Sequence, residues 1–211
     1  MECCCRRADS LPFQIPERQI LRRLGYVRNV TDVDEAQRRM LAGIIHEGAA
    51  LCRNNRGIYC APLKISAIDA DRVILASPIG DWHIDSPAVA AFLSRARGVW
   101  VGAVTLGGAI TDAASQALQA GDGARAAVLD AVGSECADAV MDALQTMAAS
   151  VLSRQGYTLD SRRFSPGYGG WTLDAQQHFF RLLQLEQLDL ELTDSRMLIP
   201  EKSVTAIAPL Y

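Results

Sequence analysis

The chain has 211 residues, of which 49% are hydrophobic and 21% are charged, and its formal net charge at pH 7 is −3. This length and apolar content suffice for one sizeable core, and the length favours one domain over two. The slightly acidic balance excludes the basic surface of a typical nucleic-acid-binding protein. No apolar run approaches the roughly 18 residues of a membrane span, and the N-terminus lacks the apolar core of a signal peptide. We therefore expect a cytoplasmic protein that binds neither nucleic acid nor membranes.

Six cysteines are present, of which three are contiguous at positions 3–5 and three are scattered farther along. Adjacent cysteines do not form ordinary framework bridges with one another, and the paired C-x-x-C spacing of a metal site is missing. This distribution argues against a disulfide framework. We expect a flexible N-terminal tail over residues 1–13 that exposes the first three cysteines, followed by one domain over residues 14–211. Cys52 and Cys136 fall among apolar helix positions and are expected to be small core residues.

Two helices are predicted at the start of the domain. Residues 16–24 form the first, because Pro16 suits the first helical turn and Gly25 stands where a helix C-cap is preferred. The second begins at Asp32 or Asp34, either of which can cap it, and its apolar spacing continues to about position 53.

A β-rich region follows. β-Branched residues are frequent in residues 58–68 and 71–77, which predicts two strands joined by a turn. Ser86, followed by a proline, caps a helix over residues 86–97. The nearly continuous apolar run over residues 99–104 is typical of a strand that is covered on both faces.

Two helices come next in the sequence. The first covers residues 110–120, and Asp122 caps the second, which can extend to Gln155 and is rich in small residues. Such a small-residue face is typical of close helix packing. The pair Gly133 and Ser134 can instead kink this helix or admit a ligand.

The last elements are a helix capped by Asp174 and a strand over residues 203–207. Helices and strands are interspersed along the whole chain without regular βαβ units. We therefore predict an α+β fold, a single domain with a mainly antiparallel twisted sheet and several packed helices.

Three smaller sequence features are weaker indications of a binding site. His83 stands in D-x-H-x-x-S, which begins like the D-x-H-x-x-G signature of corrinoid carriers but has Ser86 in place of the glycine. His46 and His178 lie on predicted helices with no partner at metal-ligand spacing, so no metal site is expected. Residues 121–126 fit G-x-G-x-x-A, but no strand precedes them, so we interpret them as a helix cap and not as a dinucleotide-binding loop.

The most informative segment is R-F-S-P-G-Y-G-G at residues 163–170. Pro166 fixes its own φ and favours an extended Ser165, and the three glycines permit positive φ or a close backbone approach to a bound group. The planar guanidinium of Arg163 suits a carboxylate or a phosphate. This mixture predicts a ligand-binding loop; the alternative is a surface turn between a helix and a strand.

The loop, the helix after it, L-T-x-S at residues 192–195 and M-x-x-P-x-x-S-V from Met197 together resemble the activation (reactivation) domain of cobalamin-dependent methionine synthase. Upstream, I-L-R-R-L-G-Y at residues 20–26 resembles that family's opening helix and turn, and V-T-L-G at residues 104–107 its strand-to-helix corner. The resemblance spans roughly residues 14–208 and implies the same α+β fold.

The resemblance implies that S-adenosylmethionine lies along the loop. Arg163 would then hold the methionyl carboxylate, and Ser165, Gly167 and Tyr168 would line the nucleoside side. The resemblance also implies an acidic residue for the ammonium group, in the helix after a Gly-Ser pair, and Asp138 stands at that place.

Glu135, one helical turn before Asp138, is a second candidate for the ammonium group, and the alternative is that both are solvated helix charges. The sequence departs from the multidomain enzymes in two ways. Gly-Gly-Trp-Thr follows the P-G-Y turn, and the sequence stops at Tyr211, before an aromatic pair that helps to enclose the nucleoside. We therefore expect a more open site.

The sequence looks like the free-standing relatives of this domain, so the implied function is reductive reactivation of a partner. No side chain of this chain is expected to be catalytic, because the sulfonium is already an activated methyl donor and the protein's part is orientation. Cobalamin is expected only on a methionine synthase core or related corrinoid protein, with electrons from a flavodoxin-like or other reductant. Two alternatives remain: a non-enzymatic adaptor that binds no S-adenosylmethionine, and a component of another corrinoid-dependent methyltransferase system.

Overall fold

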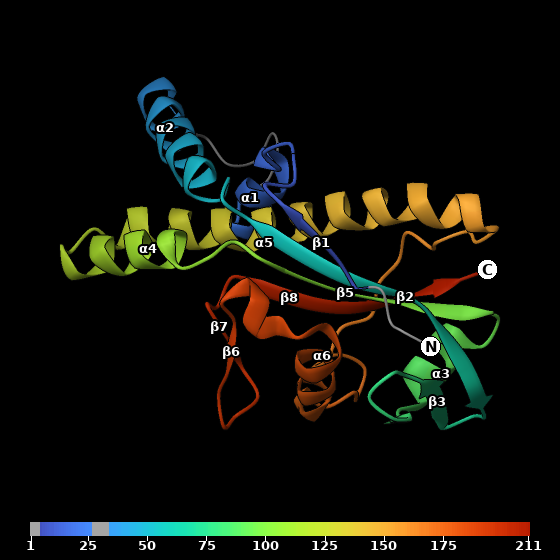
Figure 1. Ribbon diagram of the computed structural model, residues 1–211. Helices are drawn as coiled ribbons and strands as arrows, with labels where there is room; N and C mark the ends of the chain where they lie inside the picture. Colours follow the sequence, from blue (N-terminus) through green and yellow to red (C-terminus); the bar gives the residue numbers. More distant parts are fainter. Residues whose placement is uncertain (1–4, 27–33) are drawn as a thin grey trace.

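Five strands lie side by side in the order β4-β3-β2-β5-β8, and β1 adds to β2, in a computed structural model that describes residues 5–26 and 34–211 (Figure 1). The strands are β1 (Arg6–Asp9), β2 (Arg56–Ile68), β3 (Arg72–Ala76), β4 (Trp82–Asp85), β5 (Gly98–Thr105) and β8 (Ser203–Leu210), and a separate hairpin consists of β6 (Glu191–Leu192) and β7 (Leu198–Ile199). The helices are α1 (Glu17–Arg23), α2 (Glu35–Leu51), α3 (Pro87–Leu93), α4 (Ala109–Gln119), α5 (Gly123–Leu152) and α6 (Gln176–Leu183), with short 3-10 turns η1 (Ser153–Gln155), η2 (Leu173–Ala175) and η3 (Leu185–Leu188).

Every pairing in the sheet is antiparallel. This confirms the predicted α+β class with a mainly antiparallel sheet. Strand β5 lies between β2 and β8, and all eight of its residues are buried, as the continuous apolar run predicts. Within it, Gly102 is required by packing, because a Cβ there would lie 2.2 Å from the Trp100 ring.

Two hydrophobic clusters cover the two faces of the sheet. Helices α1, α2, α4 and α5 lie on one face, and α3 and α6 lie on the other (Figure 1). The alternation of β5 supplies both clusters, since Trp100 and Val104 join the first and Val99 and Val101 join the second. The second cluster also contains Trp82, Trp171 and Phe179. The sheet is therefore buried on both sides.

Helix α5 is one continuous element of 30 residues that begins at the predicted cap, where the Asp122 carboxylate accepts a bond from the Arg125 amide (2.9 Å). It has no break at Gly133 and Ser134. A Cβ at Gly133 would lie 3.1 Å from the Lys202 side chain, and Lys202 Nζ donates to Ser134 Oγ (3.0 Å). The small residues there serve packing against the start of β8.

The predicted N-terminal tail over residues 1–13 is too long. Arg6–Asp9 form β1 and pair with β2, and Leu11 is buried. The Asn55 side chain fixes Leu11 by accepting from its amide (2.9 Å) and donating to its carbonyl (3.2 Å). The domain therefore begins before residue 14, and the segment 1–4 lies outside the described residues.

Several local predictions need correction. Asp34 caps α2 in a capping box with Gln37, whereas Asp32 lies outside the described residues. Asp174 caps nothing: it lies within η2 and pairs with Arg196 (3.4 Å). The strand β4 and the hairpin of β6 and β7 were not predicted.

The bonding state of the cysteines agrees with the prediction only in part. Cys60 is disulfide-bonded, although the distribution of the cysteines argued against a disulfide framework. Cys52 and Cys136 are free and fully buried, which confirms them as core residues.

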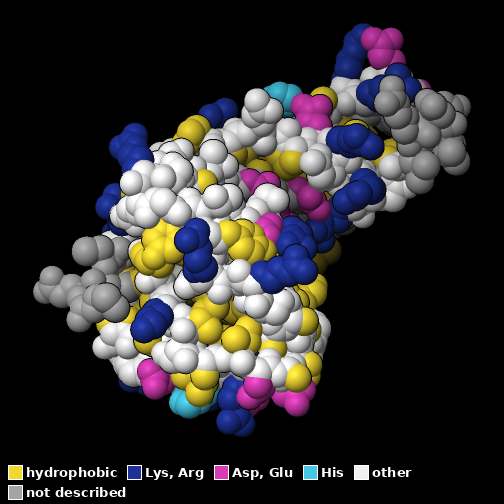
Figure 2. All heavy atoms as spheres, turned by 90° about the vertical axis from the view of Figure 1, so that its right-hand side faces the viewer, with side chains coloured by type: hydrophobic (Ala, Val, Ile, Leu, Met, Phe, Trp, Pro, Cys, Tyr) yellow, Lys and Arg dark blue, Asp and Glu magenta, His cyan; other side chains and the backbone are white. Residues whose placement is uncertain are grey.

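Charge is mixed on the face that Figure 2 shows, which is the right-hand end of Figure 1. Basic and acidic side chains are interspersed there, and hydrophobic side chains gather in the middle and lower part of the face, with further charged side chains along its lower rim. No helix in the described part of the chain is long and apolar enough to cross a membrane.

Candidate functional site

The chain before the Arg163 loop runs along the outer edge of β8, which we call the covered edge of the sheet. Phe164 and Ile207 exchange two backbone hydrogen bonds of 2.9 Å, and farther along the Thr158 and Tyr211 backbones are joined in the same way (2.9 and 3.0 Å). The Asp160 amide also donates to the Pro209 carbonyl (3.0 Å). The position of Arg163 is thereby fixed relative to the sheet.

The turn after Phe164 closes on itself. The Gly167 amide donates to the Trp171 carbonyl (2.7 Å), and the Trp171 amide donates to the Tyr168 carbonyl (2.9 Å). As predicted from the glycines, φ is positive at Gly167 (93°), Gly169 (54°) and Gly170 (79°). A Cβ at Gly169 would lie 2.7 Å from the Phe164 ring, so this turn needs a glycine there for space as well as for φ.

The turn is anchored in the core by Trp171, which is only 4% exposed. Its ring lies 6.1 Å from that of Phe164, 6.0 Å from that of Trp82 and 5.8 Å from that of Phe179, measured between centroids. Tyr168, in contrast, is 72% exposed, and Ser165 is half-buried. The loop is therefore a rigid turn that presents one aromatic side chain outward.

Arg163 reaches across to α5. Its Nη1 donates to Asp142 Oδ1 (2.5 Å) and to Gln145 Oε1 (2.7 Å), and its side chain is 18% exposed. Among the described residues, no hydrogen bond or ion pair occupies Arg163 Nη2 or Nε. Two parallel donors therefore remain available to a carboxylate.

Asp138 lies on the same side of α5, since positions 138, 142 and 145 repeat at helical spacing. Asp138 as a whole is exposed to solvent, but its carboxyl group is partly buried by neighbouring atoms. This partial burial raises the pKa of Asp138, the Arg163 guanidinium opposes the shift, and Glu135 and Asp142 add to it. The structure thus brings Arg163 and Asp138 into one electrostatic neighbourhood.

Glu135, the alternative to Asp138, is already engaged. Its Oε1 accepts from Arg23 Nε at 2.7 Å, and its side chain is only 14% exposed. Among the described residues, no hydrogen bond or ion pair joins Asp138 to Ser165, Gly167 or Tyr168. Asp138 is thus linked to Arg163 by an electrostatic interaction only.

Asp142 and Gln145 were not singled out from the sequence. The signal was present, because both follow Asp138 at helical spacing, but many polar residues on α5 share such spacing. Only the approach of the loop shows which row meets Arg163.

The histidines take no part in this site. His83 is exposed on β4, so its D-x-H motif lies on a strand at the edge of the sheet. In the portion of the chain that the structure describes, no group of three or more His, Cys, Asp or Glu side chains could hold a metal ion.

No family model and no curated protein matches the chain. Among solved structures, it is similar to the crystal structure of the MetH reactivation domain bound to AdoHcy, with a TM-score of 0.68 and 13% sequence identity. The match covers 99% of this chain and 78% of that chain. The fold is that of the MetH reactivation domain. A sequence identity of 13% shows a similar fold and nothing more. The evidence for the candidate site is therefore the geometry of the residues described above.

Proposed function

We propose that this protein binds S-adenosylmethionine beside Arg163 and presents it to a cobalamin-carrying partner for reductive methylation. The observation that carries the proposal is the Arg163 guanidinium at the covered edge of the sheet, which pairs with Asp142 and acts electrostatically on Asp138. A methionyl group carries a carboxylate and an ammonium on one carbon, and a guanidinium beside two carboxyls complements both. The bound AdoHcy of the MetH structure supports this ligand class.

The carboxylate of the ligand is assigned to Arg163. The available Nε and Nη2 of this guanidinium can take it in a bidentate pair while Nη1 stays on Asp142 and Gln145. Such a pair contributes about 1.5–3 kcal/mol net, which orients a ligand without making it tightly bound.

The ammonium group is assigned to Asp138, with Asp142 as its neighbour on the next turn. A cation bound there offsets the mutual repulsion of Glu135, Asp138 and Asp142 and stabilises the charged form of Asp138. Ser165, Gly167 and Tyr168 remain the proposed lining of the nucleoside side, where the exposure of Tyr168 leaves the site open.

The part of this chain in the reaction is positional. The sulfonium–methyl bond is already activated, so no side chain needs to act as a general acid or base. Cobalamin, carried by the partner, supplies the metal that accepts the methyl group, with an electron from a flavodoxin-like or other reductant. The residues named above bind the donor and hold its methyl group toward the partner.

Calorimetric titration with S-adenosylmethionine tests the site. Arg163→Ala is expected to weaken binding at least tenfold, because losing a charge-assisted pair costs more than about 1.4 kcal/mol. Arg162→Ala is the matched control: this neighbouring arginine pairs with Asp160 (2.8 Å) and should change the affinity little. Equal affinity of wild type and Arg163→Ala would remove Arg163 from the site.

The ammonium assignment has its own test. Asp138→Asn should weaken S-adenosylmethionine while losing the ability to discriminate against a deaminated analogue. Glu135→Gln, which breaks the pair with Arg23, should leave that discrimination unchanged. The reverse pattern would transfer the role to Glu135.

The partner requirement is tested with a cobalamin-loaded methionine synthase core, S-adenosylmethionine and a reductant. Addition of this protein should regenerate the methylcobalamin absorption spectrum, and addition of Arg163→Ala should not. Stoichiometric binding of cobalamin by the isolated chain would contradict the requirement and make His83 a candidate ligand.

A second function is an adaptor for another corrinoid-dependent methyltransferase that binds no S-adenosylmethionine. The 72% exposure of Tyr168 favours it, because the nucleoside side of the loop lacks a cover in the described structure. Stimulation of a partner without any calorimetric signal for S-adenosylmethionine would support this adaptor.

A further inference from the structure

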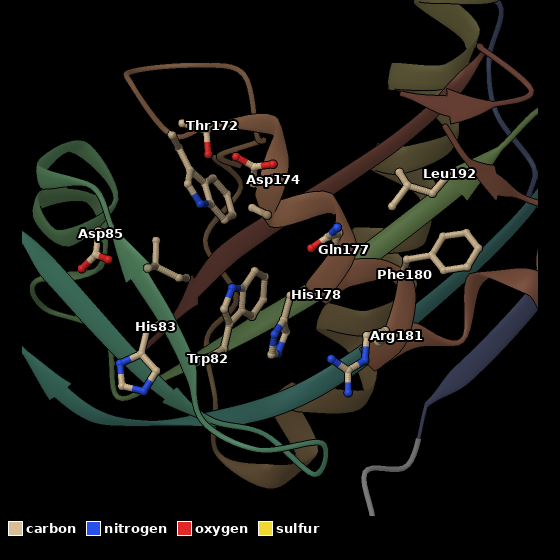
Figure 3. A pocket seen from close by; sticks show the side chains of 13 residues that line it. Trp82, His83, Asp85, Thr172, Asp174, Gln177, His178, Phe180, Arg181 and Leu192 are labelled. Atoms are coloured by element: carbon tan, nitrogen blue, oxygen red, sulfur yellow. The ribbon is translucent and has the colours of Figure 1, made fainter. Parts of the chain in front are cut away.

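A groove of about 630 Å³ lies between β4 and α6, on the opposite edge of the sheet from β8. Figure 3 shows His83 and Asp85 of β4 on one side and Gln177, His178 and Arg181 of α6 on the other. Trp82 lies between these two walls, and Trp171 also lines the groove. Trp171 anchors the Arg163 loop from this groove, but none of the residues assigned to S-adenosylmethionine lines it.

Strand β4 presents a free backbone edge to the groove, which we call the open edge of the sheet. Trp82–Asp85 pair with β3 on one side. On the other side, no backbone hydrogen bond to these residues is present within the described ranges 5–26 and 34–211. A strand edge of this kind is a template for a further strand.

The groove is preformed. The Trp82 and His178 rings stack with centroids 4.3 Å apart and an interplanar angle of 12°, and the Phe179 ring meets Trp82 edge-on at 5.0 Å. Burial lowers the pKa of His178 to about 4, with a smaller contribution from Arg181, so the stacked imidazole is neutral at pH 7. A ligand therefore meets a rigid aromatic floor and loses little to ordering it.

The charges around the groove are unevenly neutralised. Asp85 pairs with Arg72 of β3 (2.6 Å), and Asp174 pairs with Arg196 (3.4 Å). Arg181, exposed at the α6 wall, has no ion pair among the described residues. The charge left for a ligand is thus positive.

We propose that an extended, acidic segment of a partner protein docks in this groove by adding a strand to β4, with a carboxylate of the segment paired with Arg181. The free backbone groups of β4 give a main-chain ladder, and the groove takes the side chains that alternate toward α6. The unneutralised guanidinium selects an acidic partner by charge complementarity. This proposal is independent of S-adenosylmethionine binding.

The test uses a panel of short, acetylated and amidated peptides of alternating valine and threonine, each with a single glutamate at a different position. Binding to the full chain is followed by tryptophan fluorescence, to which Trp82 and Trp171 of the groove contribute together with Trp100, and by hydrogen exchange of residues 82–85. At least one peptide should bind and slow exchange in β4. A matching peptide with glutamine should bind at least about fivefold more weakly. A glutamate-free peptide with a free C-terminus shows whether a terminal carboxylate serves equally well.

Two controls decide between strand addition and unspecific attachment. N-methylation of the peptide backbone at alternate residues should abolish binding, since it removes ladder donors. Arg181→Gln should reduce binding of the glutamate peptide to that of the glutamine peptide, whereas Arg53→Gln, an exposed arginine after α2, should not. The proposal is overturned if no peptide changes fluorescence or exchange, if the methylated peptide binds equally well, or if Arg181→Gln has no effect. Because S-adenosylmethionine is absent from this test, its outcome does not depend on the proposed function.

Discussion

The two edges of the sheet are treated in opposite ways. At the covered edge, β8 has eight residues, of which the last six are buried, and the segment up to Phe164 pairs with its outer side. At the open edge, β4 has four residues that alternate between buried and exposed, and its outer side has no backbone partner in the described structure. A long apolar edge invites aggregation unless it is covered, whereas a short edge with charged side chains can stay accessible. The covering segment also carries Arg163, so protection of one edge positions the candidate site.

Trp171 connects the two edges, because its ring lies against Phe164 of the covering segment and against Trp82 of β4. Trp171→Ala should therefore reduce the free energy of unfolding by about 3–5 kcal/mol, the usual cost of emptying a buried tryptophan site. Chemical denaturation measures this loss. A loss below about 1 kcal/mol would mean that the two edges are structurally independent.

Two glycines of the loop test how tightly the turn packs at the covered edge. Gly169→Ala should cost about 2–4 kcal/mol, because it combines a positive φ with a Cβ placed 2.7 Å from Phe164. Gly170→Ala is its matched control: φ is also positive, but nothing lies within 4 Å of the added Cβ, so about 1 kcal/mol is expected. Equal costs for the two variants would show that Phe164 moves freely.

Asp160 ties the covering segment to the end of β8. Its carboxylate accepts from the Arg162 side chain (2.8 Å) and from Tyr211 Oη (3.0 Å), and these bonds hold the pKa of Asp160 well below its usual range. Asp160→Asn should cost about 1–2 kcal/mol at neutral pH.

A lowered pKa in the folded state gives stability that is present above the unfolded value and is lost as the pH falls. The difference between wild type and Asp160→Asn should therefore shrink below about pH 4. Denaturation at a series of pH values checks this trend, and a difference independent of pH would contradict it.

His178 provides the smallest expected effect, at the open edge. Its pKa is about 4 in the folded protein, and the unfolded chain takes up a proton below about pH 6.5. Wild type should therefore lose stability as the pH falls from 7 to 5. After solvent screening of this half-buried ring, we expect a loss of about 1 kcal/mol relative to His178→Gln. Titration of the His178 ring by NMR gives an independent reading, and an unshifted pKa would indicate that the stack with Trp82 opens in solution.

Much of the fold followed from local signals. The buried strand β5, the cap of α5 at Asp122 and the positive φ values in the loop were all predictable, because each depends on residues within a few positions. The N-terminal strand was missed, since its partner β2 begins at Arg56, far along the chain. Strand β4 was missed because four residues carry too little periodicity to indicate a strand.

The candidate site was likewise predictable from the sequence only in part. Arg163 and its turn were visible in the sequence as a guanidinium beside a proline and glycines, and that local chemistry determined a rigid loop. Which row of α5 the guanidinium meets, and therefore the pairing with Asp142 and Gln145, was decided only by the tertiary structure, because the loop and the helix are joined through the sheet. The open edge of β4 is likewise a tertiary property: a sequence specifies which segments can form strands, but packing of distant segments decides which edge stays free.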